Sequence, residues 1–524
     1  MNFLIWHLLR ESARLFPDKE ALVHGEERLT YREVMDRVER LADGLQNAGL
    51  SRGDRIGIYL EPSVAQVLSI FASSQADGVF VPINVQLFPE QVTHIAKDCG
   101  MKGLITTPAK LSALAPLLPQ MPSLEFLVLT GDGDVPDVSL PVYRLDKLCV
   151  ASAQKEWGDR SISKDLAAIL YTSGSTGKPK GVMLSHANVI AGSAIVSTYL
   201  EIASAERILA VLPFSFDAGL NQLMTAFHQG ATLVLTNFVF AREIVQTLLR
   251  ERITGLAGVP TVWTLLAQPS STLQKQPLPD LRYITNTGGA MPQTALAILR
   301  KALPQTKVFL MYGLTEAFRS TYLPPAEVDR RPTSMGKAIP DTEILVINEQ
   351  GKLCKPGEIG ELVHRGPTVS MGYWNRPEDT NRALRPNPLL PPEVGDCERV
   401  CYSGDLVKTD EEGFLYYVGR RDTMIKSSGF RISPTEVEEV LLRSGELQLA
   451  AVIGIPDDVL GQAIKAFVVA REGSTTLDSE KLLDYCGERM PRYMVPKVVE
   501  VLNELPKTTS GKVDYPALRR REGL

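Results

Sequence analysis

The strongest constraint on the fold is an alternation of short β-rich runs with helical patterns along most of residues 1–420. The runs "GDRIGIYLE" and "GVFVPIN" flank the helix-like "PSVAQVLSIFASSQA", and "ATLVLTN", "ITGLAGVP" and "LRYITNTGG" continue the same style. Strands that alternate with helices predict βαβ units and largely parallel sheets. Further along, "PTEVEEVLLRSGE", "LAAVIGIPD" and "AIKAFVVARE" predict a smaller α+β unit at the C-terminus.

Length and composition limit the class of protein. A chain of 524 residues, 44% hydrophobic and 22% charged, is expected to form more than one ordinary globular unit. The formal net charge of −5 provides no basic field, so no nucleic-acid partner is expected. The six cysteines are scattered, and we expect free thiols in a cytoplasmic protein.

The N-terminal "MNFLIWHLLRESARLF" is interrupted by His7, Arg10 and Glu11, which does not fit a secretory signal. Five apolar residues fit one face of an amphipathic helix: Phe3, Leu4, Leu8, Leu9 and Leu15. We expect this face to dock on the protein body rather than on a membrane. No apolar run approaches the roughly 18 residues of a membrane span, so no transmembrane segment is expected.

The stretch "YTSGSTGKPKGV" has the composition of a phosphate-binding loop. A Walker loop would place a serine or threonine after Lys178 and would then open a helix, but Pro179 follows and "GVMLS" is extended. The sequence therefore predicts strand, loop and strand. Gly174 and Gly177 let backbone N–H groups turn toward an anion, and Lys178 and Lys180 add positive charge. A flexible surface turn is the alternative.

With this loop, five further motifs in the same order resemble the adenylate-forming superfamily of acyl-CoA synthetases, luciferases and nonribosomal-peptide adenylation domains. They are "MYGLTEA", "GELVHRGPTVSMGYWNRPEDT", "YSGDL", "GRRDTMIKSSGFRISPTEVEE" and "PKTTSGKVDY". The whole chain is similar to the stand-alone acyl-CoA ligases of bacterial exosortase gene clusters. The resemblance implies a large α/β N-terminal domain of layered sheets with a β-barrel-like part, residues 1–421. It also implies a small mobile α+β domain, residues 422–524.

The resemblance implies a two-step reaction, in which a carboxylate attacks the α-phosphate of ATP and a thiol then displaces AMP. The first step brings two anions together, so catalysis must be mainly positioning and charge neutralisation. The implied catalytic residues are Lys512, Glu316 and Thr172, and Glu316 would also bind Mg²⁺. The implied nucleotide-binding residues are Thr172, Ser173, Ser175, Thr176, Lys178, Gly288, Gly289, Ala290, Tyr312, Gly313, Thr315, Asp405 and Arg420.

Individual roles also follow from the resemblance. Asp405 would accept both ribose hydroxyls, which suits a carboxylate with two acceptor oxygens. Lys512 would bridge the substrate carboxylate and the α-phosphate during adenylation. The C-terminal domain would then rotate about a hinge at Asp422, so that Ser428 and Gly429 line the thiol tunnel. An ordinary turn is the alternative for Gly429.

The resemblance implies a small, polar acyl pocket, bordered by the segment "LPFSFDAGLNQL". Its residues would be Asp217, Asn221, Ala257, Thr287, Met311, Arg319 and Ser320. Asp217 either pairs with the α-ammonium group of an amino acid or caps the helix that starts there. Arg319 pairs with a second substrate carboxylate, with Glu316 or with a surface acid.

The expected function is an ATP- and Mg²⁺-dependent, AMP-forming acid–thiol ligase with CoA as the nominal acceptor. The alternative is an amino acid–carrier protein ligase that loads the phosphopantetheine of a separate acyl carrier protein. In both cases the thiol arrives in trans, the acid is a small carboxylic or amino acid, and the enzyme is a monomer or homodimer. A non-catalytic nucleotide-binding scaffold is disfavoured because Lys512, Glu316 and Asp405 are all present. A luciferase-like oxidase would rest on the fold alone.

Overall fold

The chain divides into two compact units. The first comprises Met1–Ile344 and His364–Cys401, and the second comprises Leu345–Val363 and Tyr402–Leu524. Residues 402–421 therefore belong to the second unit. The domain boundary that the sequence analysis places between residues 421 and 422 stays a prediction. The computed structural model describes residues 2–150, 158–172, 179–395, 397–421, 423–427, 430–457, 460–471, 477–508 and 511–524.

One sheet of the first unit runs in the order β16-β15-β14-β13-β12-β10-β11-β1-β2. Its strands from β14 to β1 pair in parallel, whereas β2, β15 and β16 pair antiparallel to their neighbours, which confirms the predicted βαβ pattern. The bounds are β1 (Glu20–His24), β2 (Glu27–Thr30), β10 (Arg207–Ala210), β11 (Thr232–Leu235), β12 (Gly255–Gly258), β13 (Tyr283–Asn286), β14 (Lys307–Tyr312), β15 (Thr321–Leu323) and β16 (Ser334–Ala338).

The other sheet of this unit runs in the order β19-β9-β8-β4-β3-β5-β6-β7. Its strands from β8 to β7 are parallel, and β9 runs antiparallel to both β8 and β19. The bounds are β3 (Arg55–Ile58), β4 (Val79–Pro82), β5 (Gly103–Thr106), β6 (Phe126–Leu129), β7 (Val142–Arg144), β8 (Leu166–Thr172), β9 (Lys180–Ser185) and β19 (Gly372–Tyr373).

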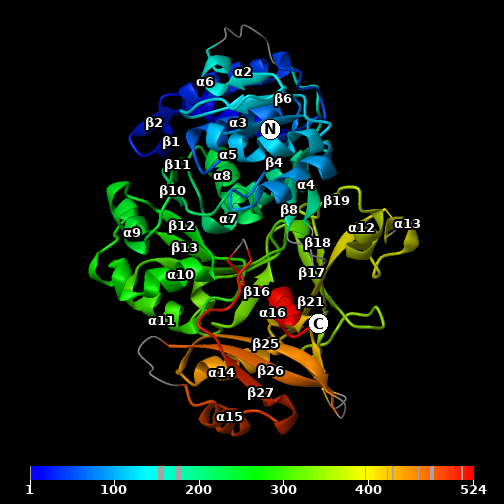
Figure 1. Ribbon diagram of the computed structural model, residues 1–524. Coiled ribbons are helices and arrows are strands. Elements are labelled where there is room, and N and C mark those ends of the chain that lie inside the picture. The colour runs from blue at the N-terminus through cyan, green and yellow to red at the C-terminus, as the bar shows by residue number, and fades with distance from the viewer. Residues whose placement is uncertain are drawn as a thin grey trace. The chain divides into compact units, whose positions relative to one another are not determined.

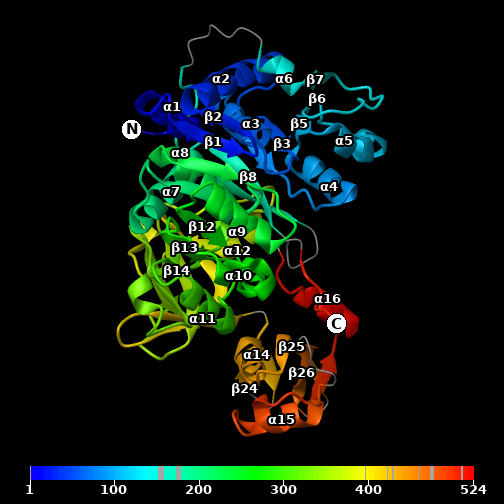
Figure 2. The ribbon, with the colours of Figure 1, turned by 90° about the vertical axis from the view of Figure 1, so that its left-hand side faces the viewer.

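A central group of helices packs with both sheets of the first unit (Figure 1, Figure 2). The group is α1 (Ile5–Leu15), α2 (Tyr31–Asn47), α3 (Val64–Gln75), α7 (His186–Leu200) and α8 (Asp217–Gln229). Helix α3 is buried on nearly every side, as its continuous apolar and small-residue sequence predicts. One hydrophobic cluster joins these helices to Leu233 of β11 and Phe80 of β4. This shared core fixes the two sheets relative to each other within the unit.

The remaining helices of the first unit cover its outer surfaces. Helices α4 (Pro89–Cys99) and α5 (Pro108–Leu114) pack in a second cluster with Val81 of β4, whose neighbour Phe80 faces the first cluster. Helix α10 contacts α9, α11 and β12. The further bounds are α6 (Leu145–Leu148), α9 (Ala241–Arg250), α10 (Pro260–Ala267), α11 (Gln293–Ala302), α12 (Pro377–Ala383), β20 (Leu384–Pro386) and α13 (Pro392–Gly395).

The N-terminal helix α1 docks on the protein body, as the sequence predicts. Ile5 and Trp6 are buried, and the Ser12 hydroxyl donates to the carbonyl of Phe227 at 2.5 Å. The predicted apolar face is only partly correct, because Phe3 and Leu15 are 50% and 51% exposed. The helix is oriented so that the polar Ser12 side chain faces α8, where the carbonyl of Phe227 accepts its hydrogen bond.

The second unit begins with strands in the order β17-β18-β21-β22 and ends in the predicted α+β unit. In the latter, the sheet order is β24-β23-β26-β25, with β27 parallel to β26. Helices α14 and α15 share one hydrophobic cluster with this sheet, and α16 shares another. The bounds are β17 (Glu343–Ile347), β18 (Gly360–Arg365), β21 (Arg399–Thr409), β22 (Leu415–Arg420), β23 (Ile425–Ser427), β24 (Phe430–Ile432), α14 (Pro434–Arg443), β25 (Leu447–Asp457), β26 (Gly461–Ala470), α15 (Ser479–Gly487), β27 (Val498–Val501) and α16 (Tyr515–Arg521).

Across the described ranges, none of the helices combines the length and apolar character that a membrane crossing needs. All six cysteines are free thiols, as expected from their scattered positions.

Candidate active site

The stretch predicted to bind phosphate connects β8 to β9, which pair antiparallel with Thr172 opposite Lys180. Helix α7 begins only after β9, where the Ser185 hydroxyl accepts from the backbone N–H of Asn188 at 3.1 Å. Because the described residues continue as strand β9 and not as a helix, the stretch is not a Walker loop, as predicted. The predicted phosphate ligands Ser173, Ser175, Thr176 and Lys178 lie outside the described residues.

Both strands that flank this loop are tied to neighbouring segments by charged groups. Lys180 forms an ion pair with Asp379 at 2.8 Å, and the hydrogen bond from Lys180 holds the pKa of Asp379 below its usual value. On β8, the Tyr171 hydroxyl donates to Asp98 at 2.7 Å, and Arg376 contacts the same carboxylate at 2.7 Å. The charge of Lys180 is therefore compensated by Asp379.

Five of the predicted nucleotide-binding residues gather at one sheet edge: Gly288, Gly289, Ala290, Tyr312 and Gly313. Strands β13 and β14 are parallel neighbours, so their carboxyl ends meet there, at the position where open α/β sheets bind ligands. After β13, Gly288 has a φ of 78°, a left-handed conformation that favours glycine. The Asn286 amide then donates to the carbonyl of Gly289 at 2.8 Å. Next to this turn, β14 ends at the half-buried Tyr312, and Gly313 follows; Ala290 lies exposed beyond the turn.

Glu316 lies just beyond β14, in the short 3-10 helix η4 (Thr315–Ala317). Its carbonyl accepts from the backbone N–H of Ser370 at 2.8 Å, and its Oε1 accepts from the Tyr373 hydroxyl at 2.6 Å. Burial, and then the charge of Glu316, raise the pKa of Tyr373, so this hydroxyl stays protonated as a donor. One carboxylate oxygen is thus held, while Oε2 has no hydrogen bond from the described part of the chain.

The Glu316 carboxylate fits Mg²⁺, because proteins usually bind this ion through one or two carboxylates together with substrate phosphates. No group of three or more His, Cys, Asp or Glu side chains that could hold a metal occurs among the residues described. Such a group is not required where phosphates supply the other ligands. Sequence reasoning missed Tyr373 as the partner of Glu316, although the signature "SMGYWNRPEDT" contains it.

The predicted acyl-pocket residues come from α8 and from the ends of β12, β13 and β14. Asp217 is the first residue of α8, whose N-cap is Phe216 without a side-chain cap bond, so the helix-cap alternative for Asp217 is wrong. Asn221 lies one helical turn later and is 2% exposed. The strand ends contribute Ala257, Thr287 and Met311.

Arg319 and Ser320 follow η4 and are both buried. The guanidinium Nη1 of Arg319 donates to Thr287 Oγ1 at 3.0 Å, and no acid in the described part of the chain forms an ion pair with it. The two protein partners expected for Arg319, Glu316 and a surface acid, are therefore not observed there. Ser320 is fully buried and shares a hydrogen bond with His364 Nδ1 at 3.0 Å.

The second unit holds the predicted ribose-binding pair. Asp405 on β21 lies directly opposite Arg420 on β22, and Oδ1 is 3.2 Å from Nη1. The Asp405 side chain is only 9% exposed, so the cation compensates a largely desolvated carboxylate. The structure brings these two predicted residues together.

The predicted catalytic Lys512 lies on a tight turn of the second unit. Lys507 and Val513 pair across the turn, and the backbone N–H of Thr508 donates to the carbonyl of Lys512 at 2.7 Å. Gly511 adopts a φ of 77° there. The side chain of Lys512 is exposed and forms no ion pair within the described ranges. The predicted hinge and tunnel residues Asp422, Ser428 and Gly429 lie outside the described residues.

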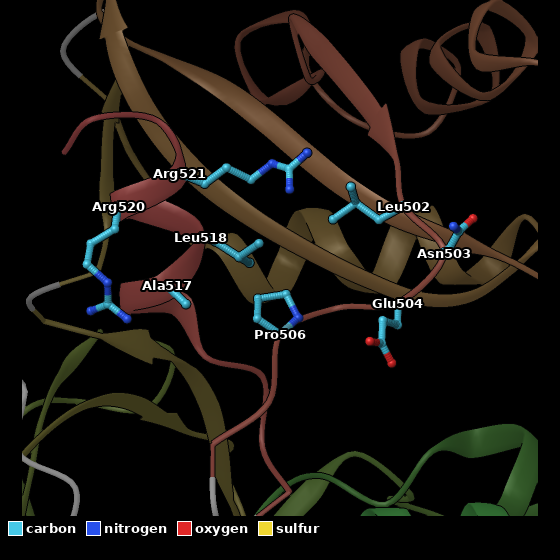
Figure 3. Close-up of a pocket in the computed structure, with 8 residues that line it drawn as sticks. All are labelled: Leu502, Asn503, Glu504, Pro506, Ala517, Leu518, Arg520 and Arg521. Atoms are coloured by element: carbon cyan, nitrogen blue, oxygen red, sulfur yellow. The ribbon is translucent and has the colours of Figure 1, made fainter.

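A hollow of about 620 Å³ lies beside α16 (Figure 3). None of the residues that line it is one of the predicted site residues. Arg521, in the lining of the hollow, forms an ion pair with Glu500 at 2.7 Å. The hollow therefore offers no match to the predicted chemistry. It is lined by Leu502, Asn503, Glu504, Pro506, Ala517, Leu518, Arg520 and Arg521.

Two family models match the chain. The AMP-binding enzyme model matches residues 9–374, and the AMP-binding enzyme C-terminal domain model matches residues 436–512. This chain belongs to the AMP-binding enzyme family. The strand edge around Glu316 and the turn that carries Lys512 both fall within the matched ranges of this family.

The sequence similarity to named relatives covers nearly the whole chain. Feruloyl-CoA synthase from Amycolatopsis sp is 34% identical over 519 residues, which cover 98% of this chain and 97% of that protein. Long-chain-fatty-acid–CoA ligase from Bacillus subtilis (strain 168) is 30% identical over 550 residues, which cover 99% of this chain and 94% of that protein.

Solved structures of similar enzymes match the fold. The anthranilate CoA ligase AuaEII in complex with anthranoyl-AMP gives a TM-score of 0.89 at 25% identity, covering 99% of this chain and 97% of that chain. The o-succinylbenzoate coenzyme A synthetase MenE from Bacillus subtilis, in complex with ATP and magnesium ion, gives a TM-score of 0.83 at 26% identity. That match covers 98% of this chain and 99% of the MenE chain. Together, these proteins support AMP-forming ligation of an acid to CoA as the reaction class, and they do not favour the carrier-protein alternative.

Proposed function

We propose that this chain activates a compact carboxylic acid as its acyl-adenylate and then transfers the acyl group to CoA. The observation that carries the proposal is the hydrogen bond from Tyr373 to Glu316, which lies in η4 just beyond the carboxyl end of β14 at Tyr312. This arrangement suits a nucleotide whose base lies near the strand end and whose phosphates reach the Glu316 carboxylate. ATP and Mg²⁺ are both present in the MenE structure.

Each proposed residue then has one task. Glu316 would hold Mg²⁺, which neutralises phosphate charge when bound. Thr172 and the loop after it would bind the outer phosphates, and Asp405 would accept the ribose hydroxyls. Lys512 would place its ammonium between the carboxylate and the α-phosphate, two anions that otherwise repel each other. We expect the enzyme to work in the cytoplasm as a monomer or homodimer.

The proposed acid is compact because the predicted pocket does not suit a long alkyl chain. A Cβ atom on Gly192 of α7 would lie 2.5 Å from the Phe318 ring, so this ring already fills the space against the helix. The next residue places the Arg319 cation among the pocket residues, where an alkyl chain would leave it unsolvated. Feruloyl-CoA synthase and anthranilate CoA ligase, both named for aromatic acids, are among the similar proteins.

Pyrophosphate release with ATP and Mg²⁺ would test this function across benzoate, ferulate, phthalate, glutarate, palmitate and the proteinogenic amino acids, with acyl-CoA formation followed by mass spectrometry. We expect a compact acid to exceed palmitate by at least about 100-fold in kcat/KM and to yield its CoA thioester. A preference for palmitate would contradict the proposal. An amino-acid substrate that is lost in Asp217→Ala would establish the amino-acid alternative instead.

A further inference from the structure

Arg319 is a buried cation without a protein counter-ion among the described residues. It is 5% exposed, its Nη1 donates to Thr287 Oγ1 at 3.0 Å, and its Nε has no hydrogen-bond partner. Burial of an unpaired charge is costly, and a buried arginine normally pairs with a carboxylate. The Thr287 hydroxyl is neutral and satisfies only one of the five guanidinium N–H groups.

The backbone around Arg319 is held in an unusual conformation. Phe318 and Arg319 have φ angles of 21° and 106°, in the region that non-glycine residues rarely adopt. Gly313 permits this path, because a Cβ atom there would lie 3.0 Å from the Cα of Arg319. Backbone strain of this kind persists where the surrounding structure enforces it and often marks a ligand site. The strained backbone conformation therefore occurs at Arg319 itself, the residue that carries the buried cation.

The groups around Arg319 do not supply negative charge. The Tyr199 hydroxyl of α7 donates weakly to the Met311 sulfur at 3.5 Å. Burial raises the pKa of Tyr199, so the phenol is neutral, although the charge of Arg319 opposes this rise. A second predicted pocket residue also lacks an acceptor, because Asn221 Nδ2 is buried without a hydrogen-bond partner. Two buried donors among the predicted pocket residues therefore need acceptors from a ligand.

We propose that Arg319 binds a second carboxylate of the substrate, so that this enzyme activates dicarboxylic acids. The inference rests on the proposed function, in which this pocket holds the acid. Nε and Nη2 form one edge of the guanidinium group, and a carboxylate binds side-on to such an edge through two parallel hydrogen bonds. With Nη1 on Thr287, this edge faces the second carboxylate, while the first carboxylate attacks ATP.

Matched acid pairs would test the proposal in two ways. Glutarate, adipate and phthalate would each be compared with their monomethyl esters, which keep the reacting carboxylate but remove the second charge. Wild-type protein and Arg319→Gln would be assayed for pyrophosphate release and for the shift of melting temperature on ligand binding. Arg300→Gln would be the matched control, because Arg300 lies on α11 and pairs with Asp329 at 2.7 Å.

We expect the wild type to favour at least one diacid over its ester by about 100-fold in kcat/KM, as loss of a charge-assisted bidentate contact implies. Arg319→Gln should remove this preference by lowering kcat/KM for the diacids far more than kcat/KM for their esters, while Arg300→Gln retains the preference. Diacids should raise the melting temperature of the wild type but not of Arg319→Gln. The ligand-free variant should melt no lower than the wild type, because it no longer buries an unpaired charge.

Other outcomes separate the two proposals. Equal use of diacids and esters by the wild type, or equal loss of both in Arg319→Gln, would overturn the role of Arg319 while the ligase function stands. Absence of pyrophosphate release with every acid would overturn the proposed function. In that case the melting-temperature shifts still decide whether Arg319 binds the second carboxylate.

Discussion

The Glu316 carboxylate depends on one neighbouring hydroxyl, so Tyr373→Phe removes a single hydrogen bond while it keeps the ring. We expect kcat/KM for pyrophosphate release to fall about 10-fold, since a hydrogen bond to a charged group is worth about 1.5 kcal/mol or more. The Mg²⁺ concentration needed for half-maximal rate should rise. Steady-state rates over a Mg²⁺ titration would measure both effects.

Tyr143→Phe is the matched control for this substitution. Tyr143 packs on Phe126 in the same unit, and its hydroxyl makes no hydrogen bond to the described residues. Its loss should leave the Mg²⁺ dependence unchanged. An unchanged Mg²⁺ dependence in Tyr373→Phe would mean that Tyr373 does not position a carboxylate that binds Mg²⁺.

The exposed Lys512 allows a second residue-scale prediction. Lys512→Ala should slow adenylation by at least about 1,000-fold, because it removes the positive charge proposed to lie between the two reacting anions. Thioester formation from supplied acyl-AMP should continue near the wild-type rate. Pyrophosphate release and single-turnover acyl-CoA formation would separate the half-reactions. Lys507→Ala, five residues earlier and also exposed, should leave both intact.

At this scale the sequence indicates residues within motifs better than it indicates their partners. Asp405 and Arg420 were both predicted to bind the nucleotide, and the structure shows that they form an ion pair. Tyr373 and Asp98 were missed, because each meets its partner through a contact between segments far apart in the chain. The alternatives for Arg319 could be narrowed only when burial and neighbouring charges were known.

Among the elements, α14 contains a buried glutamate that links the C-terminal helix to the sheet. Glu438 Oε1 accepts from the Tyr515 hydroxyl at 2.7 Å and from the backbone N–H of Val452 at 2.8 Å. Burial raises the pKa of Glu438 to about 7, from 4.5. The folded state therefore binds a proton more tightly than the unfolded chain, and this stabilisation is present below pH 4.5 and is lost as pH rises through 7.

Glu438→Gln should remove this pH dependence, because its amide oxygen still accepts both hydrogen bonds but does not ionise. We expect the variant to melt higher than the wild type at pH 8 and close to it at pH 5. Melting temperatures across this range would measure the difference. A difference that is independent of pH would show that Glu438 does not titrate between these values. Glu439→Gln, on the more exposed side of α14, gives a comparison for a neighbouring carboxylate.

The elements themselves could be predicted well from periodicity. The runs around β3, α3, β4, β11, β12 and β13 were all expected, as were α14, β25 and β26. The orientation of a helix and the first residue inside it were less predictable. Asp217 begins α8 without capping it, and α1 buries Trp6 while Phe3 is exposed. These details depend on tertiary packing, which overrides a local pattern.

For the whole molecule, the alternation of strands and helices predicts parallel sheets but not their strand order. In one sheet β1 lies beside β11, and Leu22 of β1 is the register partner of Leu233, which lies far along the chain. Hydrophobic periodicity carries no information on such a pairing. Only pairing between distant segments fixes such an order. The motif order along the chain indicated the family, whereas the grouping of Leu345–Val363 with Tyr402–Leu524 had no sequence signal.

The two proposed half-reactions place different groups at the same carbonyl. In the proposed mechanism Lys512 lies near the phosphates during adenylation, whereas the thiol reaches the carbonyl afterwards, so one group has to leave before the other enters. The resemblance places the necessary rotation at Asp422. Asp422→Pro would fix φ near −65° and remove a backbone N–H there. We expect thioester formation to fall about 100-fold while pyrophosphate release stays within about 3-fold of the wild type.

Asp422→Ala is the control, because it removes the carboxylate but leaves φ free to change. It should retain both half-reactions, measured as burst pyrophosphate release and as acyl-CoA formation from supplied acyl-AMP. If Asp422→Ala is as defective as Asp422→Pro, the side chain and not backbone rotation is required. If both half-reactions fall together in Asp422→Pro, the substitution damages the site itself, and the hinge must lie elsewhere in the chain.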